Sequence, residues 1–368
     1  MDQSQIFDNL FFFILFGGTT MAALISCVYL LLRQGNAFAA DVTPPVRLRR
    51  WAASFFAVDV LEHIWWLLFY LYSGDVHSVF YMVVCSLDFT TMITTIAGTL
   101  LAMLQDRKRH FWPFILATIP YSALLVLNIV YPDSHFLVIA MAYVLVFYGL
   151  FTIYIVFAVR QYGRWLRDNY ADLEHKEGRQ SYMLIIVFSL FVIFYGLADN
   201  ITISYFVQFI GLALFGFLLW RVETLQQLDA ATAENTAETP AEPEAVAPLT
   251  IPSDIGQLIE RHCEGEQLYL QHDLSLSQLS QVIGTNHYYL SQHFTQQGLT
   301  YNAYINDLRI RHFIDLYHEA VANQRSFTAQ QLAHESGFRS YSTFSAAFKQ
   351  RMGQTVTAWM RDATEAEN

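Results

Sequence analysis

The sequence is short of charged residues. Lys, Arg, Asp and Glu make up 14% of the 368 residues, whereas soluble globular proteins contain about 25%. Hydrophobic residues reach 54% and aromatic residues 16%. This deficit excludes an ordinary soluble protein for most of the chain, and it predicts a membrane protein with many lipid-facing and interfacial side chains.

Cysteine is also scarce, because the chain contains only Cys27, Cys85 and Cys263. Three cysteines exclude a disulfide framework. Two of them, Cys27 and Cys85, lie in apolar runs, where a thiol acts as a small hydrophobic group. We predict no catalytic residue, no metal and no cofactor, and we expect that the chain is not an enzyme.

Long apolar runs are abundant, and runs of about 18 or more residues indicate transmembrane helices. We predict seven of them. They are Ile6–Leu32, Trp51–Tyr72, Val79–Leu104, Phe111–Tyr131, Phe136–Val159, Tyr182–Ala198 and Ile201–Trp220. The sixth is the shortest, and only Asp199 and Asn200 separate it from the seventh, which predicts a tight turn.

Basic residues are missing from every second connection between these runs. The connections after the first, third and fifth runs hold Arg33, Arg47, Arg49, Arg50, Arg107, Lys108, Arg109, Arg160, Arg164, Arg167, Lys176 and Arg179. The other connections hold no Lys or Arg. Because positive loops stay in the cytoplasm, this asymmetry predicts a multi-pass protein of a bacterial inner membrane. Its N-terminus would lie outside and its C-terminus in the cytoplasm.

Lys and Arg are also absent from residues 222–252, which are rich in Ala, Glu and Pro. Such a composition cannot bury a core and predicts a flexible acidic linker. The linker divides the chain into a seven-helix transmembrane sensor domain, residues 1–221, and a cytoplasmic domain, residues 253–368. A flexible linker conveys proximity between domains rather than rotation.

The cytoplasmic domain repeats one pattern twice: a helix, a glycine turn and a second helix. The expected segments are Leu274–Ile283, Asn286–Gln297, a connecting helix Tyr301–His318, Ala329–Glu335 and Tyr341–Arg351. Gly284 and Gly337 fall in the two turns. This pattern places a second helix in a DNA major groove. The predicted fold class is therefore all-α, with a transmembrane bundle and two helix-turn-helix units.

The same region resembles the AraC/XylS-type DNA-binding domain. The residues that carry the resemblance are Leu279, Leu290, Phe294, Gly298, Arg309, Gly337, Phe338, Ser340, Phe344, Phe348, Lys349, Gly353 and Arg361. The resemblance covers the cytoplasmic domain alone. It implies two recognition helices that read successive major grooves on one face of double-stranded DNA. Gln292 and Ala346 stand where the family often has Arg.

By position, the residues expected to face DNA are Tyr288, Ser291, Gln292, Tyr341, Ser342, Thr343 and Ser345. Gln can bind adenine with two hydrogen bonds, whereas Ser is less selective. Between Glu266 and Arg361 there are seven basic and six acidic residues, a net charge of +1. Such a charge gives a weak attraction to phosphates. We therefore expect a homodimer rather than a single copy on DNA.

One transmembrane run contains ionisable residues that are costly in a bilayer. Asp59, Glu62, His63 and Trp66 share one helical stripe, and Asp88 on the next run is expected at the depth of His63. A polar network that pins the helices is one interpretation. A sensor pocket for a small polar or cationic ligand is another. A metal site or an intramembrane hydrolase is a third.

Together these features predict a membrane-anchored one-component transcriptional regulator. The transmembrane domain would sense a signal, and the AraC-type domain would bind promoter DNA. Two alternatives remain. One is a membrane enzyme or transporter with an autoregulatory soluble domain, and the other is a receptor whose helical domain binds a protein.

Overall fold

A computed structural model describes residues 10–33, 36–39, 42–72, 75, 78–132, 135–176, 200–228 and 255–367. The predicted sixth span, Tyr182–Ala198, lies outside the described residues, as does most of the predicted linker. The described residues fall into two units. We call Met1–Tyr162 with His175–Leu228 the N-terminal unit, and Gly163–Glu174 with Asp229–Asn368 the C-terminal unit.

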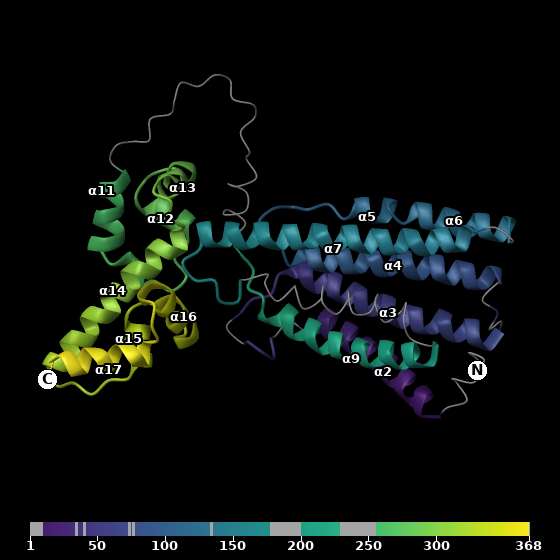
Figure 1. Cartoon of the computed structure of the whole chain (residues 1–368), viewed down its shortest axis with the longest axis horizontal. Coiled ribbons are helices and arrows are strands. Elements are labelled where there is room, and N and C mark those ends of the chain that lie inside the picture. The colour runs from purple at the N-terminus through teal and green to yellow at the C-terminus, as the bar shows by residue number, and fades with distance from the viewer. Residues whose placement is uncertain are drawn as a thin grey trace, which may run out of the picture. The chain divides into compact units, whose positions relative to one another are not determined.

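Helices account for the regular structure of the described residues, apart from an isolated antiparallel bridge between Tyr170 and Ser275. The helices of the N-terminal half are α2 (Leu10–Leu32), α3 (Val46–Tyr72), α4 (Val79–Ala102), α5 (Trp112–Leu116), α6 (Ile119–Val130), α7 (Phe136–Asn169) and α9 (Asn200–Thr224) (Figure 1). The predicted all-α fold class is confirmed.

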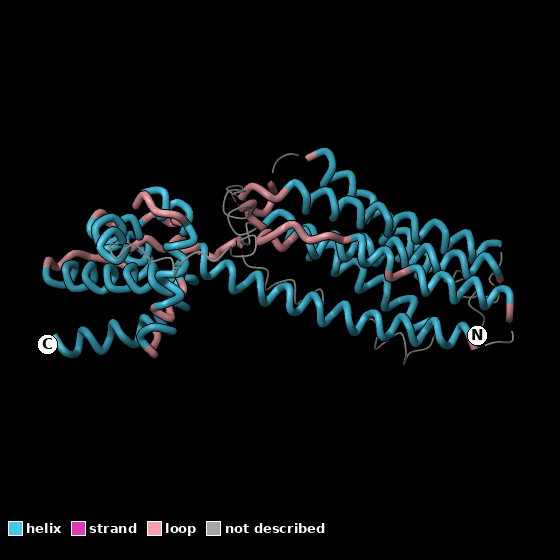
Figure 2. The backbone as a smooth tube through the Cα atoms, turned by 90° about the horizontal axis from the view of Figure 1, so that it is seen from above, coloured by secondary structure: helices cyan, strands magenta, loops and turns pink. Residues whose placement is uncertain are grey.

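Six of the described helical segments are long and apolar enough to cross a membrane. They correspond to six of the seven predicted runs. Helix α2 packs on α3 and α9, and α3 packs on α4 (Figure 1). Figure 2 shows the described part of the chain as helices joined by loops. Large apolar side chains such as Ile25, Leu145 and Phe157 are more than half exposed, which suits contact with lipid.

The fourth of these segments is broken. Helix α5 ends at Leu116 and α6 begins at Ile119, with Pro120 in the first turn of α6. A proline has no amide hydrogen for the preceding turn, so a continuous helix cannot pass this point without a defect. The predicted run Phe111–Tyr131 therefore folds as two short helices, which both pack on α4.

Helix α7 is longer than its predicted apolar run, which ends at Val159. Its 34 residues correspond to about 50 Å at 1.5 Å per residue, whereas the hydrocarbon core of a bilayer is about 30 Å thick. The excess lies at the polar C-terminal end, because the helix continues to Asn169. Residues Gly163–Glu174, which include this end of the helix, belong to the C-terminal unit.

The C-terminal unit is built around one long helix, α14 (Tyr301–Ala322). The other elements are α11 (Ile255–Ile259), a π-helical turn η1 (Glu260–Gly265), a 3-10 turn η2 (Leu268–Leu270), α12 (Leu276–Val282), α13 (His287–Gln296), α15 (Ala329–Glu335), α16 (Tyr341–Met352) and α17 (Val356–Glu367). Helix α14 links α12 and α13 to α15 and α16 (Figure 1).

Two cores lie along α14. The first includes Leu279, Leu290, Phe294 and Ile305. The second is more aromatic and includes Phe313, Phe338, Phe344 and Phe348. Each core closes one pair of short helices against α14, so the two predicted helix-turn-helix units are confirmed.

Candidate functional site

The first helix of each helix-turn-helix unit begins with the same hydrogen-bonded box. Ser275 Oγ accepts the amide of Gln278 at 3.2 Å, and Gln278 Oε1 accepts the amide of Ser275 at 2.8 Å. Thr328 and Gln331 form the equivalent pair before α15, with both distances at 3.1 Å. A capping box satisfies amides that a helix start leaves without partners. It therefore fixes where α12 and α15 begin.

The recognition helices α13 and α16 also begin with polar caps. Asn286 Oδ1 accepts the amide of Tyr288 at 2.9 Å, and Ser340 Oγ accepts the amide of Thr343 at 3.3 Å. In helix-turn-helix proteins the N-terminal residues of this helix contact base edges. A helix N-terminus also attracts phosphate. The caps therefore set the two ends at which DNA contact is expected.

The predicted DNA-facing residues differ in exposure. Tyr288 is 54% exposed and Tyr341 is 36% exposed, so both tyrosines project from the first turn of a recognition helix. Ser342 is also exposed, whereas Ser291, Gln292, Thr343 and Ser345 are half-buried. Gln292 Oε1 is buried without a hydrogen-bond partner among the described residues. The Gln292 side chain would have to turn outward to read adenine.

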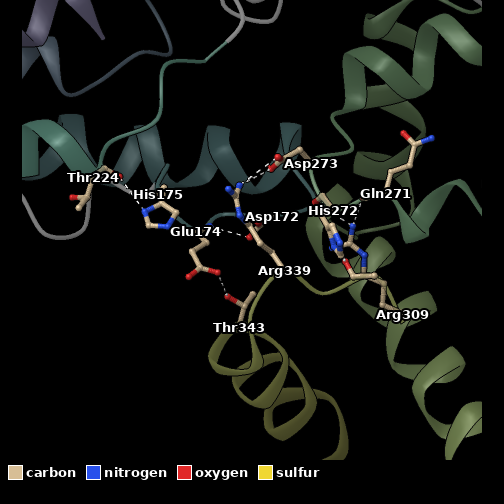
Figure 3. Close-up of polar contacts among 11 residues, drawn as sticks. Asp172, Glu174, His175, Thr224, Gln271, His272, Asp273, Arg309, Arg339 and Thr343 are labelled. Carbon is tan, nitrogen blue, oxygen red and sulfur yellow. Dashed lines mark hydrogen bonds and ion pairs between the residues drawn. The ribbon is translucent and has the colours of Figure 1, made fainter. Parts of the chain in front are cut away.

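Arg309 of α14 joins the two helix-turn-helix units. Its guanidinium is 1% exposed and donates from Nε to the carbonyl of Tyr269 at 2.7 Å. It also donates to the carbonyls of Gln271 and His272, at 2.6 and 3.3 Å (Figure 3). It lies 5.6 Å from the ring centre of Phe338 in the second unit. Burial lowers the pKa of Arg309 to about 10, so the side chain is charged at neutral pH.

Two further contacts tie the segment before α12 to the second turn. His272 Nδ1 donates to the carbonyl of Gly337 at 3.0 Å. Arg339 lies 3.3 Å from a carboxylate oxygen of Asp273 (Figure 3). Together with Arg309, these contacts hold the second helix-turn-helix turn against the first unit. They fix the relative placement of the recognition helices α13 and α16.

The surface charge of the C-terminal unit is largely paired. Ion pairs join Arg311 and Arg351 to Asp307, Arg325 to Glu335, Arg339 to Asp273 and Arg361 to Asp362. Exposed pairs of this kind contribute about 0–1 kcal/mol each to stability. They also reduce the positive potential that the domain presents to phosphates, in agreement with the net charge of +1 between Glu266 and Arg361.

The intramembrane candidates lie close together in the N-terminal unit. Asp59, Glu62 and His63 are each 8–9% exposed. His63 Nδ1 donates to the backbone carbonyl of Asp59 at 2.8 Å and lies 3.3 Å from its carboxylate. The Phe16 ring of α2 covers the imidazole at a centroid distance of 4.6 Å. The stripe on α3 therefore faces the bundle interior.

The hydrogen bonds of this cluster join α3 to α4 and α9. The carboxylate of Asp88 on α4, which the sequence placed at the depth of His63, accepts from Trp66 Nε1 at 3.3 Å, one turn further along α3. His63 Nε2 lies 3.3 Å from Gln208 Oε1 of α9. Glu62 accepts from Thr91 at 3.5 Å. Among the described residues, no group of three or more His, Cys, Asp or Glu is arranged to hold a metal ion.

Sequence reasoning missed two parts of these sites. Gln208 is an isolated polar residue in an apolar run. That isolation could have indicated a buried hydrogen bond, here with His63. The other part is the stretch from Asn169 to Glu174, which belongs to the C-terminal unit and contacts α12, α13, α14 and α16. That short polar segment has no periodicity, and the sequence placed it simply in a cytoplasmic connection.

Comparison with known proteins identifies the C-terminal region. A family model described as "Helix-turn-helix domain" matches residues 279–362. Uncharacterized HTH-type transcriptional regulators of Staphylococcus aureus strains COL, MSSA476 and N315 are each 30% identical to this chain over 106 residues. The match covers 28% of this chain and 13% of each relative. No solved structure matches the chain significantly.

The family match begins at residue 279, after the long apolar helices. The matches agree with the fold, in which α12 to α17 form two capped helix-turn-helix units. The predicted resemblance is therefore confirmed for the C-terminal region: residues 279–362 are an AraC-type helix-turn-helix domain.

Proposed function

We propose that this chain is a membrane-anchored transcriptional regulator that binds DNA through α13 and α16 and senses a signal through its membrane helices. One observation carries the proposal. Two capped recognition helices, each with an exposed tyrosine in its first turn, are held in a fixed relation by the buried Arg309. Two helices fixed in this way suit successive major grooves of one duplex. The relatives are named as HTH-type transcriptional regulators, which supports a role in transcription.

Selection of duplexes from a random-sequence library tests DNA binding without knowledge of the target. The full chain in lipid nanodiscs is expected to enrich sites with two short motifs about one helical turn, or 10 base pairs, apart. Tyr288→Ala should erase one motif and Tyr341→Ala the other. Glu319→Gln, an exposed change on α14, is the control and should keep both. Failure to enrich any sequence would favour the alternative receptor that binds a protein.

Signal sensing is the second part of the proposal. Asp59, Glu62, His63, Trp66 and Asp88 would form the site, with Gln208 as an added member. Buried polar groups at membrane depth commonly mark ligand or ion sites. A small polar or cationic ligand is the proposed class. A polar network that only pins the helices is the competing interpretation, and protein level distinguishes the two.

A reporter fused to a promoter that the protein binds tests this part. Asp59→Asn, His63→Ala and Asp88→Asn are expected to change reporter output at unchanged protein level. Reduced protein level with a proportional loss of output would instead show a structural role. Thr94→Ala, a polar change elsewhere on α4, serves as the control.

Homodimerisation and orientation complete the proposal. The weak net charge predicts that two copies are needed on DNA, so single-molecule counting in nanodiscs should find pairs on selected duplexes. The basic connections predict that the N-terminus lies outside and the C-terminal unit in the cytoplasm of a bacterial inner membrane. Alkaline phosphatase fused after Arg221 should be inactive, and activity there would overturn this orientation.

A further inference from the structure

The end of α7 belongs to the C-terminal unit rather than to the N-terminal unit. Residues up to Tyr162 group with the membrane helices, whereas Gly163–Glu174 group with the helix-turn-helix domain. The chain therefore enters the DNA-binding domain before it reaches the predicted linker. We call Asn169–Glu174 the docking segment. It directly follows Gly163–Asp168, and both stretches group with the helix-turn-helix domain.

The first half of the docking segment is built into the first helix-turn-helix unit. Tyr170 forms an antiparallel bridge with Ser275, the cap of α12. The amide of Ala171 donates to the carbonyl of Leu274 at 3.1 Å. Ala171 is 1% exposed and belongs to the first core. Asn302 of α14 donates to the Ala171 carbonyl at 2.6 Å. These backbone contacts anchor the segment.

Asn169 reaches the start of the first recognition helix. His287, the first residue of α13, donates from Nε2 to Asn169 Oδ1 at 2.8 Å. Burial lowers the pKa of His287 below its usual value of 6.5. The imidazole is thus neutral at physiological pH. Its hydrogen bond holds Asn169, the last residue of α7, next to the first turn of α13.

The second half of the segment carries two acidic residues toward the second unit. Asp172 is 2% exposed and accepts the amide of Glu174 at 3.0 Å. The negative charge of Asp172 favours the charged form of Arg309. The turn formed by Asp172 presents the Glu174 side chain to α16 (Figure 3). Thr343 Oγ1 donates to Glu174 Oε2 at 3.4 Å.

Thr343 lies in the first turn of α16 and is one of the residues expected to contact DNA. A carboxylate at a helix N-terminus is favoured by the helix dipole, and a DNA phosphate is favoured at the same place for the same reason. Glu174 and DNA therefore compete for one end of α16. The carboxylate also repels phosphates, in a domain whose positive charge is already weak.

We propose that the docking segment is an autoinhibitory device, in which Asn169, Tyr170 and Ala171 are a permanent anchor and Glu174 is a latch on the second recognition helix. DNA must displace Glu174 from Thr343 before α16 enters the major groove. Because the anchor continues directly from α7, movement of that helix would reach the latch without passing through residues 229–254. This inference rests on the proposed DNA-binding function.

Affinity measurements with the full chain in nanodiscs test the latch. The probe is a fluorescein-labelled duplex selected by the wild-type protein. Gln at position 174 can still accept from Thr343, but a hydrogen bond to a neutral acceptor is weaker than one to a carboxylate by about 1 kcal/mol, which corresponds to about fivefold in Kd. Glu174→Gln is therefore expected to bind the duplex about fivefold more tightly. Glu319→Gln makes the same charge change away from the recognition helices and should stay within twofold.

A disulfide tests the geometry directly. Glu174→Cys combined with Thr343→Cys is expected to cross-link on oxidation when DNA is absent, and the selected duplex should slow the reaction. The oxidised double variant should lose tight DNA binding, and a reductant should restore it. Each single variant, treated with oxidant, is the control. The native Cys263 is 0% exposed, and burial raises its pKa to about 12, so it should not react.

The outcomes separate the latch from DNA binding itself. If Glu174→Gln and Glu319→Gln change the Kd for the duplex equally, the effect comes from net charge alone, and the latch is overturned. So would a cross-linked protein that binds DNA as tightly as the reduced one. If no variant binds any duplex, the proposed DNA-binding function fails, and the latch fails with it. A missing cross-link in a protein that does bind DNA would refute the latch alone.

Discussion

The two helix-turn-helix units share one plan but are completed differently. Both have a capping box on the first helix, a glycine turn and a polar cap on the recognition helix. The first core is closed in part by Ala171, which follows the end of the apolar helix α7. The second core is closed by aromatic residues of its own sequence, among them Phe344 and Trp359. One unit is thus joined to the N-terminal half of the chain, and the other is self-contained.

Under the proposed function, this difference gives the two helix-turn-helix units different roles. The first unit would stay attached to the end of α7, since backbone contacts at Tyr170 and Ala171 hold it there. The docking segment reaches the second helix-turn-helix unit through the hydrogen bond from Thr343 to Glu174 at 3.4 Å. A hydrogen bond of this length is weak enough to be switched. Regulation would therefore act on the second unit.

The largest expected effect on stability comes from replacing Arg309, which joins the two helix-turn-helix units. Arg309→Met keeps much of the side-chain volume but leaves the carbonyls of Tyr269, Gln271 and His272 without their donor. We expect the C-terminal unit to lose about 3–5 kcal/mol of unfolding free energy. Pulse proteolysis of the full chain in urea measures this loss. Arg311→Met, which breaks an exposed ion pair, should cost about 1 kcal/mol or less.

The turn glycines provide a second test of the comparison. Gly284 and Gly337 both have positive φ, at 70° and 92°. A Cβ at Gly284 would meet nothing within 4 Å, whereas one at Gly337 would lie 2.8 Å from Leu270 Cα. Gly284→Ala should therefore cost only the left-handed backbone penalty of about 1–2 kcal/mol. Gly337→Ala should cost more, because the chain at Leu270 must also move.

The same urea experiment measures both glycine variants. Equal destabilisation would show that Gly337 does not pack closely against Leu270. The two helix-turn-helix units would then not be in close contact at this turn. Gly353→Ala is a useful third variant, since Gly353 also has positive φ and open space around it. Its cost should match that of Gly284→Ala.

The sequence predicted most of the architecture because the signals were long or repeated. Six apolar runs and two helix–glycine–helix patterns each involve many residues with one periodicity. They form the expected helices, except that the run Phe111–Tyr131 is divided into α5 and α6. The docking segment was not predicted because Tyr170 and Ala171 make their contacts mainly through the backbone. Such contacts leave little trace in side-chain chemistry.

The partners within the membrane were predicted only in part. Helical periodicity placed Asp59, Glu62 and His63 on one face, and these residues are all buried. The sequence placed Asp88 at the depth of His63 by counting residues from a turn, and such a count does not give hydrogen-bond partners. The observed partner of Asp88 is Trp66, three residues beyond His63. Gln208 could be placed only once α9 was packed against α3.

The smallest expected effect concerns pH and the anchor at the first unit. Burial lowers the pKa of His287 in the folded protein below its usual value of 6.5. The unfolded chain then binds a proton more readily than the folded chain as pH falls below 6.5. Stability from His287 is therefore intact above that pH and declines as pH falls from 6.5 toward the lowered pKa.

The difference between wild type and His287→Gln isolates this contribution. Gln cannot titrate, so the variant should show a shallower loss of stability between pH 6.5 and 5 in urea unfolding of the C-terminal unit. Burial also lowers the pKa of His293, but that group is present in both proteins and cancels. Identical pH profiles would contradict a buried, neutral His287 beside Asn169.

Chromatin immunoprecipitation with sequencing of the full, tagged chain tests the central claim most directly. The account predicts enriched promoter regions that contain two short motifs about one helical turn apart. It also predicts that a Tyr288→Ala, Tyr341→Ala double variant, expressed at the same level in the same membrane, loses those regions. A chain that enriches no region under any growth condition, or a double variant with an unchanged profile, would contradict DNA recognition by α13 and α16.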